Sequence, residues 1–333
     1  MTAATYDVLG IGNAIVDILA KTEDKFLTEQ GMAKGSMALI DEARAAAIYD
    51  AMGPATEISG GSAANTIAGV ANLGARAAFV GKVRNDQLGN VFSHDIRAAG
   101  VAFATHAASH GPATARCYVL VSPDGERTMN TYLGAAQDLS PADIDPVQIA
   151  ASSIVYLEGY LWDPANAKEA FLKASKIAHE NKRSVALTLS DAFCVGRYRD
   201  EFLDLIRSKT VDLVFANEAE LASLYQTDDF DKALVQLRGD ATLAVVTRSE
   251  KGCVVVAKDK VTPVPASPVK QVVDTTGAGD LFAAGFLFGT VRGLSHEQCG
   301  RLGALAAAEV IQHIGARPQT SLKALAQEAG LPA

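Results

Sequence analysis

The sequence lacks the features of several large protein classes. It has 30 Lys and Arg against 38 Asp and Glu, a net charge of −8, and so offers no basic surface for nonspecific binding of nucleic acid. It has no apolar run of about 18 residues that would span a bilayer. The opening MTAATYDVLGIG lacks the basic residues that begin a signal peptide. We therefore expect neither a nucleic-acid nor a membrane partner.

Cysteine is also scarce, and its positions are scattered. The four residues Cys117, Cys194, Cys253 and Cys299 form no C-x-x-C pair. Neither a disulfide framework nor a zinc site is expected from such spacing. Reduced thiols are the expected state, and together with the missing leader they predict a cytoplasmic protein.

Two common nucleotide-binding motifs are missing. No G-x-x-x-x-G-K-[ST] occurs, so any ATP site is not a Walker P-loop. The stretch LGIGNAIVDI (9–18) begins like a dinucleotide-binding fingerprint, but Ile15 stands where the third glycine belongs, which argues against a dehydrogenase. Asn13 and Asp17 are polar side chains within this apolar stretch. They are either binding residues or local Asx-turn and edge-strand residues.

What the sequence does contain is a regular alternation of strand-like and helix-like segments. The runs SSIVYLEG, RSVALTLS, VDLVFA and TLAVVTR predict buried strands, and segments such as 165–180 and 200–208 between them predict helices. ARAAFVGKV followed by NDQLGNVFSHDIRAAG predicts one more such unit in the first half. Alternation of this kind predicts βαβ units and a mostly parallel sheet covered on both faces.

Other segments do not follow this alternation. Strands at 14–22, 34–41, 101–107 and 115–132, the last with a hairpin turn at SPDG, predict a smaller sheet that covers the carboxyl edge of the main sheet. We therefore expect residues 1–12, 45–100 and 133–333 to form an α/β/α nucleotide-binding and catalytic domain. Residues 13–44 and 101–132 would then form a discontinuous β lid.

The stretch VVDTTGAGDLFAAGF (272–286) carries the strongest chemical signal. The backbone amides of Gly277, Ala278 and Gly279 would lie at a helix N-terminus, which suits an anion. Asp280 lies in the first turn, where the helix dipole alone would explain an acid and would keep its pKa low. The combination fits phosphoryl transfer: the carboxylate accepts a hydroxyl proton while the amides stabilise the transferring group.

Two further motifs each have a structural and a functional interpretation. In GGSAANT (60–66), Gly61 permits close approach of the backbone to a ligand and Asn65 offers both a donor and an acceptor, although the motif taken alone favours an ordinary helix start. In ANEAE (216–220), Asn217 and Glu220 form either a capping box or a group that organises water and Mg²⁺ near nucleotide phosphates.

GGSAAN, NEAE and DTTGAGD, in this order along the chain, resemble the signature regions of the ribokinase-like (PfkB) carbohydrate kinase family. The resemblance covers essentially the whole chain. It implies a three-layer α/β/α Rossmann-like domain with a mostly parallel central sheet and a small β lid. It also implies an enzyme that transfers the ATP γ-phosphoryl group to a hydroxymethyl group and needs Mg²⁺.

The resemblance also implies roles for individual residues. Asp280 would be the general base, and the amides of Gly277, Ala278 and Gly279 the anion hole. Substrate hydroxyls would be bound by Asn13, Asp17, Gly61 and Asn65. Asn217 and Glu220 would serve the nucleotide phosphates and Mg²⁺, Glu220 through water.

The resemblance extends to the nucleotide and cation sites with two departures. Thr247 matches a nucleotide-site threonine, with Gly252 also assigned to that site, but Ser249 stands where the family motif has glycine. Asp274 and Thr276, with the loop 315–316, occupy positions that hold a monovalent cation in many members, which makes K⁺ a candidate.

Within the family, GNAIVDI and residues 185–220 are most similar to adenosine kinases. The acceptor would then be the 5′-hydroxyl of a nucleoside, converted from adenosine to AMP in purine salvage. Tyr160 and Phe193 would lie near the pocket and stack on a purine, or else would be core aromatics. The alternatives are a sugar kinase acting on ribose or fructose and, more remotely, a catalytically silent binding regulator. Some relatives pair through the lid, so a homodimer is a candidate.

Overall fold

A nine-stranded sheet forms the centre of the molecule. The computed structural model describes residues 4–333. The strands follow the order β14-β13-β12-β11-β10-β9-β1-β5-β6, and neighbours from β12 to β6 pair in parallel. Their bounds are β1 (Tyr6–Ile11), β5 (Ala77–Val80), β6 (Val101–Phe103), β9 (Ser152–Glu158), β10 (Ser184–Thr188), β11 (Leu213–Asn217), β12 (Leu243–Thr247), β13 (Cys253–Ala257) and β14 (Val261–Val264). The β-branched apolar runs thus form the predicted parallel sheet.

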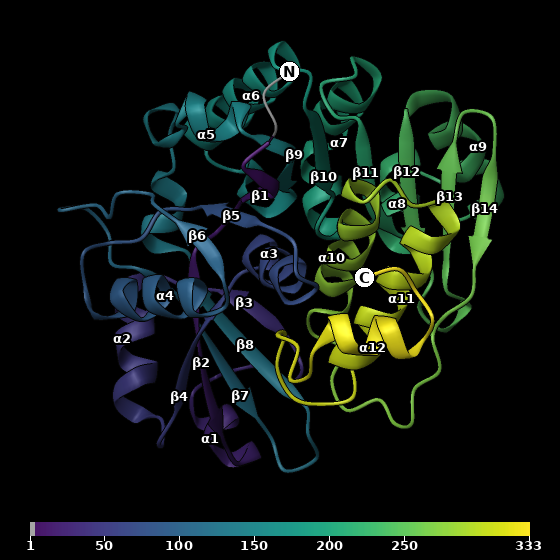
Figure 1. The fold of residues 1–333 in the computed structure, drawn as a ribbon. Coiled ribbons are helices and arrows are strands. Elements are labelled where there is room, and N and C mark those ends of the chain that lie inside the picture. The colour runs from purple at the N-terminus through teal and green to yellow at the C-terminus, as the bar shows by residue number, and fades with distance from the viewer. Residues whose placement is uncertain (1–3) are drawn as a thin grey trace.

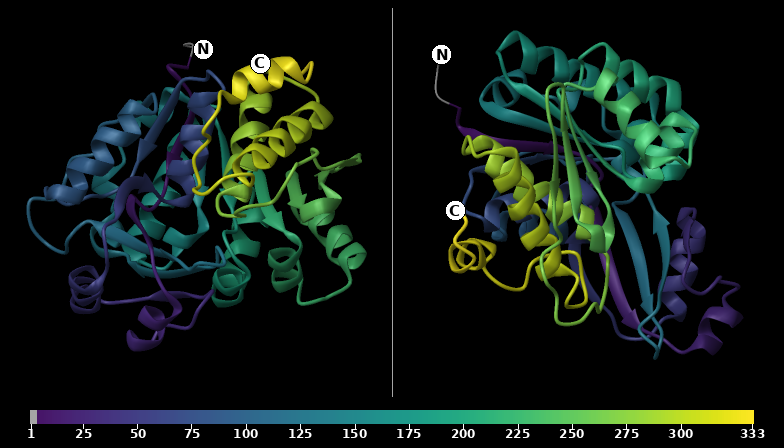
Figure 2. Two further views of the ribbon diagram at one scale, coloured as in Figure 1. Left: turned by 90° about the horizontal axis from the view of Figure 1, so that it is seen from below. Right: turned by 90° about the vertical axis from the view of Figure 1, so that its right-hand side faces the viewer.

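Helices cover both faces of this sheet and complete three layers (Figures 1 and 2). One face is covered by α3 (Ser62–Asn72), α4 (Gln87–Ala98), α10 (Ala278–Val291), α11 (His296–Val310) and α12 (Leu322–Glu328). The other is covered by α5 (Pro146–Ala150), α6 (Ala165–Glu180), α7 (Ala192–Arg207), α8 (Glu218–Tyr225) and α9 (Phe230–Asp240). The predicted α/β/α fold is confirmed.

A separate five-stranded sheet has the order β3-β8-β7-β2-β4. Its strands are β2 (Ile15–Lys21), β3 (Met37–Leu39), β4 (Thr56–Gly60), β7 (Ala115–Val121) and β8 (Arg127–Tyr132), with α1 (Asp24–Glu29) and α2 (Glu42–Ala51) beside them. β7 and β8 form the predicted hairpin, in which Gly125 has a φ of 86° and the Ser122 amide donates to the Glu126 carbonyl at 2.9 Å. The predicted second sheet is therefore present.

Two segments lie in a different sheet from the predicted one. The strand expected at 101–107 is not part of the lid: β6 pairs with β5 at the edge of the large sheet. It follows α4 through Gly100, whose φ is 84°, and so completes a βαβ unit. Residues 56–60 were expected in the large domain, but β4 pairs antiparallel with β2 in the small sheet. The rest of the expected division into domain and lid stays a prediction.

Helix α10 is the apolar support of the site. Its residues from Leu281 to Gly289 are buried between the large sheet and α11. The packing is close: a Cβ atom on Gly69 of α3 would lie 2.7 Å from the Ala284 methyl group. α10 spans only 14 residues, and within residues 4–333 no helix is long and apolar enough to cross a membrane.

Candidate active site

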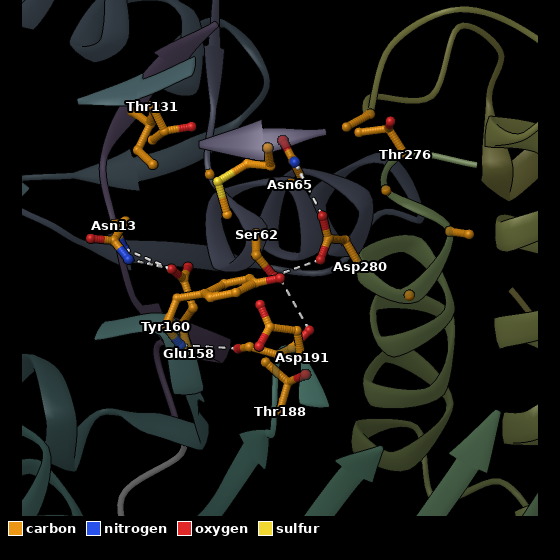
Figure 3. Close-up of a pocket in the computed structure, with 18 of the residues that line it drawn as sticks. Asn13, Ser62, Asn65, Thr131, Glu158, Tyr160, Thr188, Asp191, Thr276 and Asp280 are labelled. Carbon is orange, nitrogen blue, oxygen red and sulfur yellow. Dashed lines mark hydrogen bonds between the residues drawn. The ribbon is translucent and has the colours of Figure 1, made fainter. Parts of the chain in front are cut away.

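A cavity of about 740 Å³ lies between the two sheets, at the carboxyl ends of the parallel strands. Ligands of open α/β sheets bind at this edge. Most of the predicted site residues line it: Asn13, Asp17, Gly61, Asn65, Tyr160, Phe193, Asn217, Glu220, Thr247, Thr276, Gly277, Ala278, Gly279 and Asp280. Figure 3 labels Asn13, Asn65, Tyr160, Thr276 and Asp280 among them. Residues of the small sheet, among them Asp17 and Thr131, form part of its wall, so this sheet covers the site as expected. Gly252 and Asp274 lie outside the wall.

Asp280 is held by two donors from the first turns of α3. Ser62 Oγ donates to Oδ1 at 2.6 Å and Asn65 Nδ2 donates to Oδ2 at 3.1 Å (Figure 3). Burial raises the pKa of Asp280, and these hydrogen bonds and the charge of Arg317 oppose the rise without cancelling it. The expectation that the helix dipole keeps this pKa low is therefore wrong, because desolvation outweighs it.

The N-terminus of α10 presents free backbone donors beside Asp280. Gly277 is its N-cap residue, with a φ of 79° and no side-chain cap. The amide of Ala278 donates to the Thr275 carbonyl at 3.2 Å, which closes a turn. The amides of Gly277 and Gly279 have no acceptor within residues 4–333. Two of the three predicted anion-hole donors are thus free, and that of Ala278 is engaged.

Glu158 is a site residue that the motifs did not indicate. Only 1% of it is exposed, and it accepts from Asn13 Nδ2 at 2.6 Å and from the Ala63 amide at 2.8 Å. Burial raises its pKa to about 7 despite these hydrogen bonds. Asn13 Oδ1 has no partner among the described residues, and so is a free acceptor in the cavity wall. The signal was an acid at the end of the apolar strand IVYLE.

Asp17 contributes a half-buried carboxylate to the cavity wall. No hydrogen bond reaches it from any residue of the described chain, and burial raises its pKa to about 7. The charges of Arg317 and Arg127 lower this pKa, whereas Asp280 raises it. An unpartnered acceptor in a cavity suits a ligand hydroxyl.

The two predicted aromatic residues lie in the cavity wall. Tyr160 donates from its amide to Ser190 Oγ at 3.1 Å and from its hydroxyl to the Ser190 carbonyl at 3.2 Å. Phe193 is 70% exposed, with the Arg197 guanidinium 4.5 Å from its ring centroid. The alternative that they are core aromatics is therefore wrong, while stacking on a purine stays a prediction.

Asn217 and Glu220 form a complete capping box at the start of α8. The Glu220 amide donates to Asn217 Oδ1 at 2.9 Å, and Asn217 donates back to both carboxylate oxygens, at 3.1 and 2.6 Å. Burial raises the Glu220 pKa to about 7. The structural interpretation is confirmed, and the nucleotide role stays a prediction.

Of the other residues predicted to bind the nucleotide, one lines the cavity and one shapes a nearby turn. Thr247 ends β12 in the cavity wall, and its hydroxyl donates to the Ala216 carbonyl at 3.4 Å. Gly252 has a φ of 83°, and a Cβ there would collide with the Val264 carbonyl, so it shapes the turn into β13. Ser249 has a φ of 51°, which explains why glycine suits this position.

Asp274 links strand β8 of the small sheet to the TTGAG loop (275–279). Its carboxylate accepts from the amides of Thr276 and Gly315, both at 3.0 Å, and forms an ion pair with Arg127 of β8. Arg127 Nη1 also donates to Thr276 Oγ1 at 2.8 Å. The sequence gave no signal for Arg127, because the contact depends on how the hairpin folds over the cavity.

The model of the pfkB family carbohydrate kinases matches residues 49–323. The chain belongs to this family. It is accordingly an ATP-dependent phosphotransferase that acts on a hydroxyl group. The match includes all three motifs and the helices that carry them.

Among proteins of similar sequence or structure, some are named adenosine kinases and others sugar kinases. Adenosine kinase from Sinorhizobium meliloti is 57% identical, with a TM-score of 0.92 over 98% of this chain and 100% of that one. A probable sugar kinase from Rhizobium etli is 54% identical, with a TM-score of 0.93 over 99% and 100%. Adenosine kinase 2 of Arabidopsis thaliana is 28% identical over 94% of this chain and 96% of its own.

Proposed function

We propose that the protein transfers the γ-phosphoryl group of ATP to the 5′-hydroxyl of adenosine, forming AMP in purine salvage. The observation that carries the proposal is the placement of Asp280, held by Ser62 and Asn65, beside the free amides of Gly277 and Gly279. Similarity to the adenosine kinases of S. meliloti and A. thaliana supports the acceptor.

The residues of the cavity would divide the work between binding and proton transfer. Asp17 and the free Oδ1 of Asn13 accept hydrogen bonds from ribose hydroxyls, with Gly61 and Asn65 shaping that side. Asp280 accepts the proton of the attacking hydroxyl as the new O–P bond forms. The α10 amides stabilise the oxygens of the transferring phosphoryl group.

Mg²⁺ fits this site only with ligands that the nucleotide supplies. Among residues 4–333 no three His, Cys, Asp or Glu side chains converge as a metal site. Glu220 uses both carboxylate oxygens in its capping box, so it would contact the ion through water while the phosphates bind it directly. When bound, the ion neutralises phosphate charge; this chain orients the phosphates through Asn217, Thr247 and α10.

We also propose K⁺ as a candidate ligand of the loop that includes Thr276 and residues 315–316. Arg127 already neutralises Asp274, so the ion would bind mainly through carbonyl oxygens of this loop. We expect activation by KCl over tetramethylammonium chloride to be small, and to grow in Arg127→Met. Equal rates in both salts for both proteins would remove K⁺ from the proposal.

The acceptor is tested by a panel of candidate substrates. ADP release is measured with Mg-ATP and adenosine, inosine, guanosine, ribose or fructose, and adenosine should give the highest kcat/KM. A higher value for a free sugar would favour the sugar kinase alternative, which the R. etli relative supports. Binding without ADP release would favour the silent regulator.

Location, assembly and lid motion complete the proposal. A cytoplasmic location is supported by four buried free cysteines, Cys117, Cys194, Cys253 and Cys299.

A homodimer through the small sheet is supported by the exposed edge strand β3 and is tested by light scattering. Closure of the lid on ligands would exclude water, and unchanged small-angle scattering with adenosine and an ATP analogue would contradict it.

A further inference from the structure

The loop after α11 places an arginine behind Asn65. Arg317 Nε donates to Asn65 Oδ1 at 2.7 Å, and its Nη2 donates to Ser59 Oγ at 3.3 Å. The guanidinium thus ties this loop to α3 and β4. None of the sequence motifs includes Arg317, and none of the roles proposed above uses it.

The contact fixes the orientation of the Asn65 carboxamide. Arg317 can only donate, so the Asn65 oxygen must face it and the Asn65 amino group must face away. That amino group donates to Asp280 Oδ2 at 3.1 Å. In the reversed orientation the Asn65 oxygen would face the carboxylate of Asp280 and repel it.

Arg317 is also the cation that acts on Asp280. The other polar groups that act on or around Asp280 are neutral or acidic: Ser62 and Asn65 from α3, Asp17 from β2, Tyr156 and Glu158 from β9, and Tyr160. Arg127 acts on Asp17. Desolvation lowers the pKa of Arg317 to about 10, so its guanidinium stays charged at neutral pH.

We propose that Arg317 is a positioning residue for phosphoryl transfer, which holds Asp280 charged and directed at the acceptor hydroxyl through Asn65. The inference rests on the proposed function only in requiring transfer to a hydroxyl, and it holds for a nucleoside or a sugar acceptor. Removing the arginine frees the carboxamide to turn and removes a positive charge, and both changes favour the protonated, inactive form of the base.

The test is the pH dependence of kcat in Arg317→Met, from about pH 5.5 to about pH 9.5, with the acceptor that the wild type uses best. The acid limb of the profile, where kcat falls as the pH decreases, should move to higher pH by about one unit. At low pH the variant should therefore have a kcat about tenfold below that of the wild type, and this difference should shrink as the pH rises. Arg317→Lys keeps the charge without the planar donor and should give an intermediate limb. The exposed Arg301→Met removes an equal charge elsewhere and should keep the wild-type limb.

Several outcomes would overturn the inference. A loss of kcat that is uniform across the pH range, or no loss, would leave Arg317 without this role. If Arg317→Met does not fold, the Lys variant and Arg317→Gln carry the same comparison. In the Asn65→Ala background, Arg317→Met should cost less kcat than it does in the wild type, because only the loss of the positive charge remains; fully additive losses would contradict action through Asn65. A wild type that phosphorylates no acceptor would instead refute the proposed function.

Discussion

The N-termini of α3 and α10 face the same cavity, yet their positive ends meet different partners. Both helices begin at a glycine with positive φ, 96° at Gly61 and 79° at Gly277, and neither has a side-chain cap. At α3 the Ala63 amide already donates to the fixed carboxylate of Glu158, whereas at α10 the amides of Gly277 and Gly279 lack an acceptor in the described chain. The N-terminus of α3 already binds a carboxylate of the protein, so it suits neutral hydroxyl groups of a ligand. The N-terminus of α10 has free amides, so it suits a phosphoryl group.

The largest expected effect follows from removing Asp280, the proposed base, which lies between the two helices. Asp280→Asn keeps the acceptor for Ser62 but cannot take a proton, so kcat should fall by about 10² to 10⁴. Calorimetry should still show binding of acceptor and ATP. The wild-type kcat/KM should also fall with decreasing pH through the raised pKa of Asp280, since the ionised form is the base. Near-normal turnover of the variant would exclude Asp280 as the base.

The sequence predicted the features of the site that depend on residues close together in the chain, and missed those that depend on residues far apart. Local patterns indicated the glycine starts, the Asn217–Glu220 capping box and the alternation that builds the parallel sheet. They did not indicate Arg127 or Arg317, because each contacts a residue more than a hundred positions away, Asp274 and Asn65 respectively. The low pKa expected for Asp280 was wrong because dipole arguments consider the helix and not the depth of the cavity.

The next largest effects are expected from replacing the glycines that begin α3 and α10, and they should differ between the two. In Gly277→Ala the new Cβ would lie 2.8 Å from Ala316, and in Gly61→Ala it would collide with the Asn13 carbonyl. Each variant should lose about 1–3 kcal/mol of unfolding free energy because of its positive φ. Gly277→Ala should mainly raise the KM for ATP and lower kcat, and Gly61→Ala should mainly raise the KM for the acceptor.

The two glycine variants are compared with a control variant in another helix. Gly239 in α9 has no neighbour within 4 Å of an added Cβ, so Gly239→Ala should gain about 0.5–1 kcal/mol with unchanged kinetics. Unfolding by urea and initial rates at varied ATP and acceptor provide both readouts. If Gly61→Ala affected the KM for ATP and Gly277→Ala that for the acceptor, the assignment of the two helix ends would be reversed.

Glu158 makes the α3 end sensitive to pH. Its folded pKa of about 7 exceeds the unfolded value of 4.5, so the native state binds the extra proton between these values. Stability from this group is therefore full below about pH 4.5 and is lost as the pH rises through about 7. Between pH 5 and 8 the unfolding free energy of the wild type should therefore fall. In Glu158→Gln this fall should be smaller, by up to about 3 kcal/mol. Exposed Glu250→Gln should keep the wild-type slope, and an unchanged slope in Glu158→Gln would show that this carboxylate does not resist ionisation.

The smallest effect concerns Ser249, a residue with positive φ that is not glycine. Ser249 has a φ of 51° like the two glycines, but it is exposed, so its side chain meets no collision. Ser249→Gly relieves about 1 kcal/mol of backbone strain and loses a similar amount through the greater freedom of the unfolded chain. Urea unfolding should therefore change by less than about 0.5 kcal/mol, with the KM for ATP within about twofold of the wild type. A much larger change in KM would mean that Ser249 contacts the nucleotide. The steric collision at Gly61 and Gly277 would then not be what sets these two positions apart from Ser249.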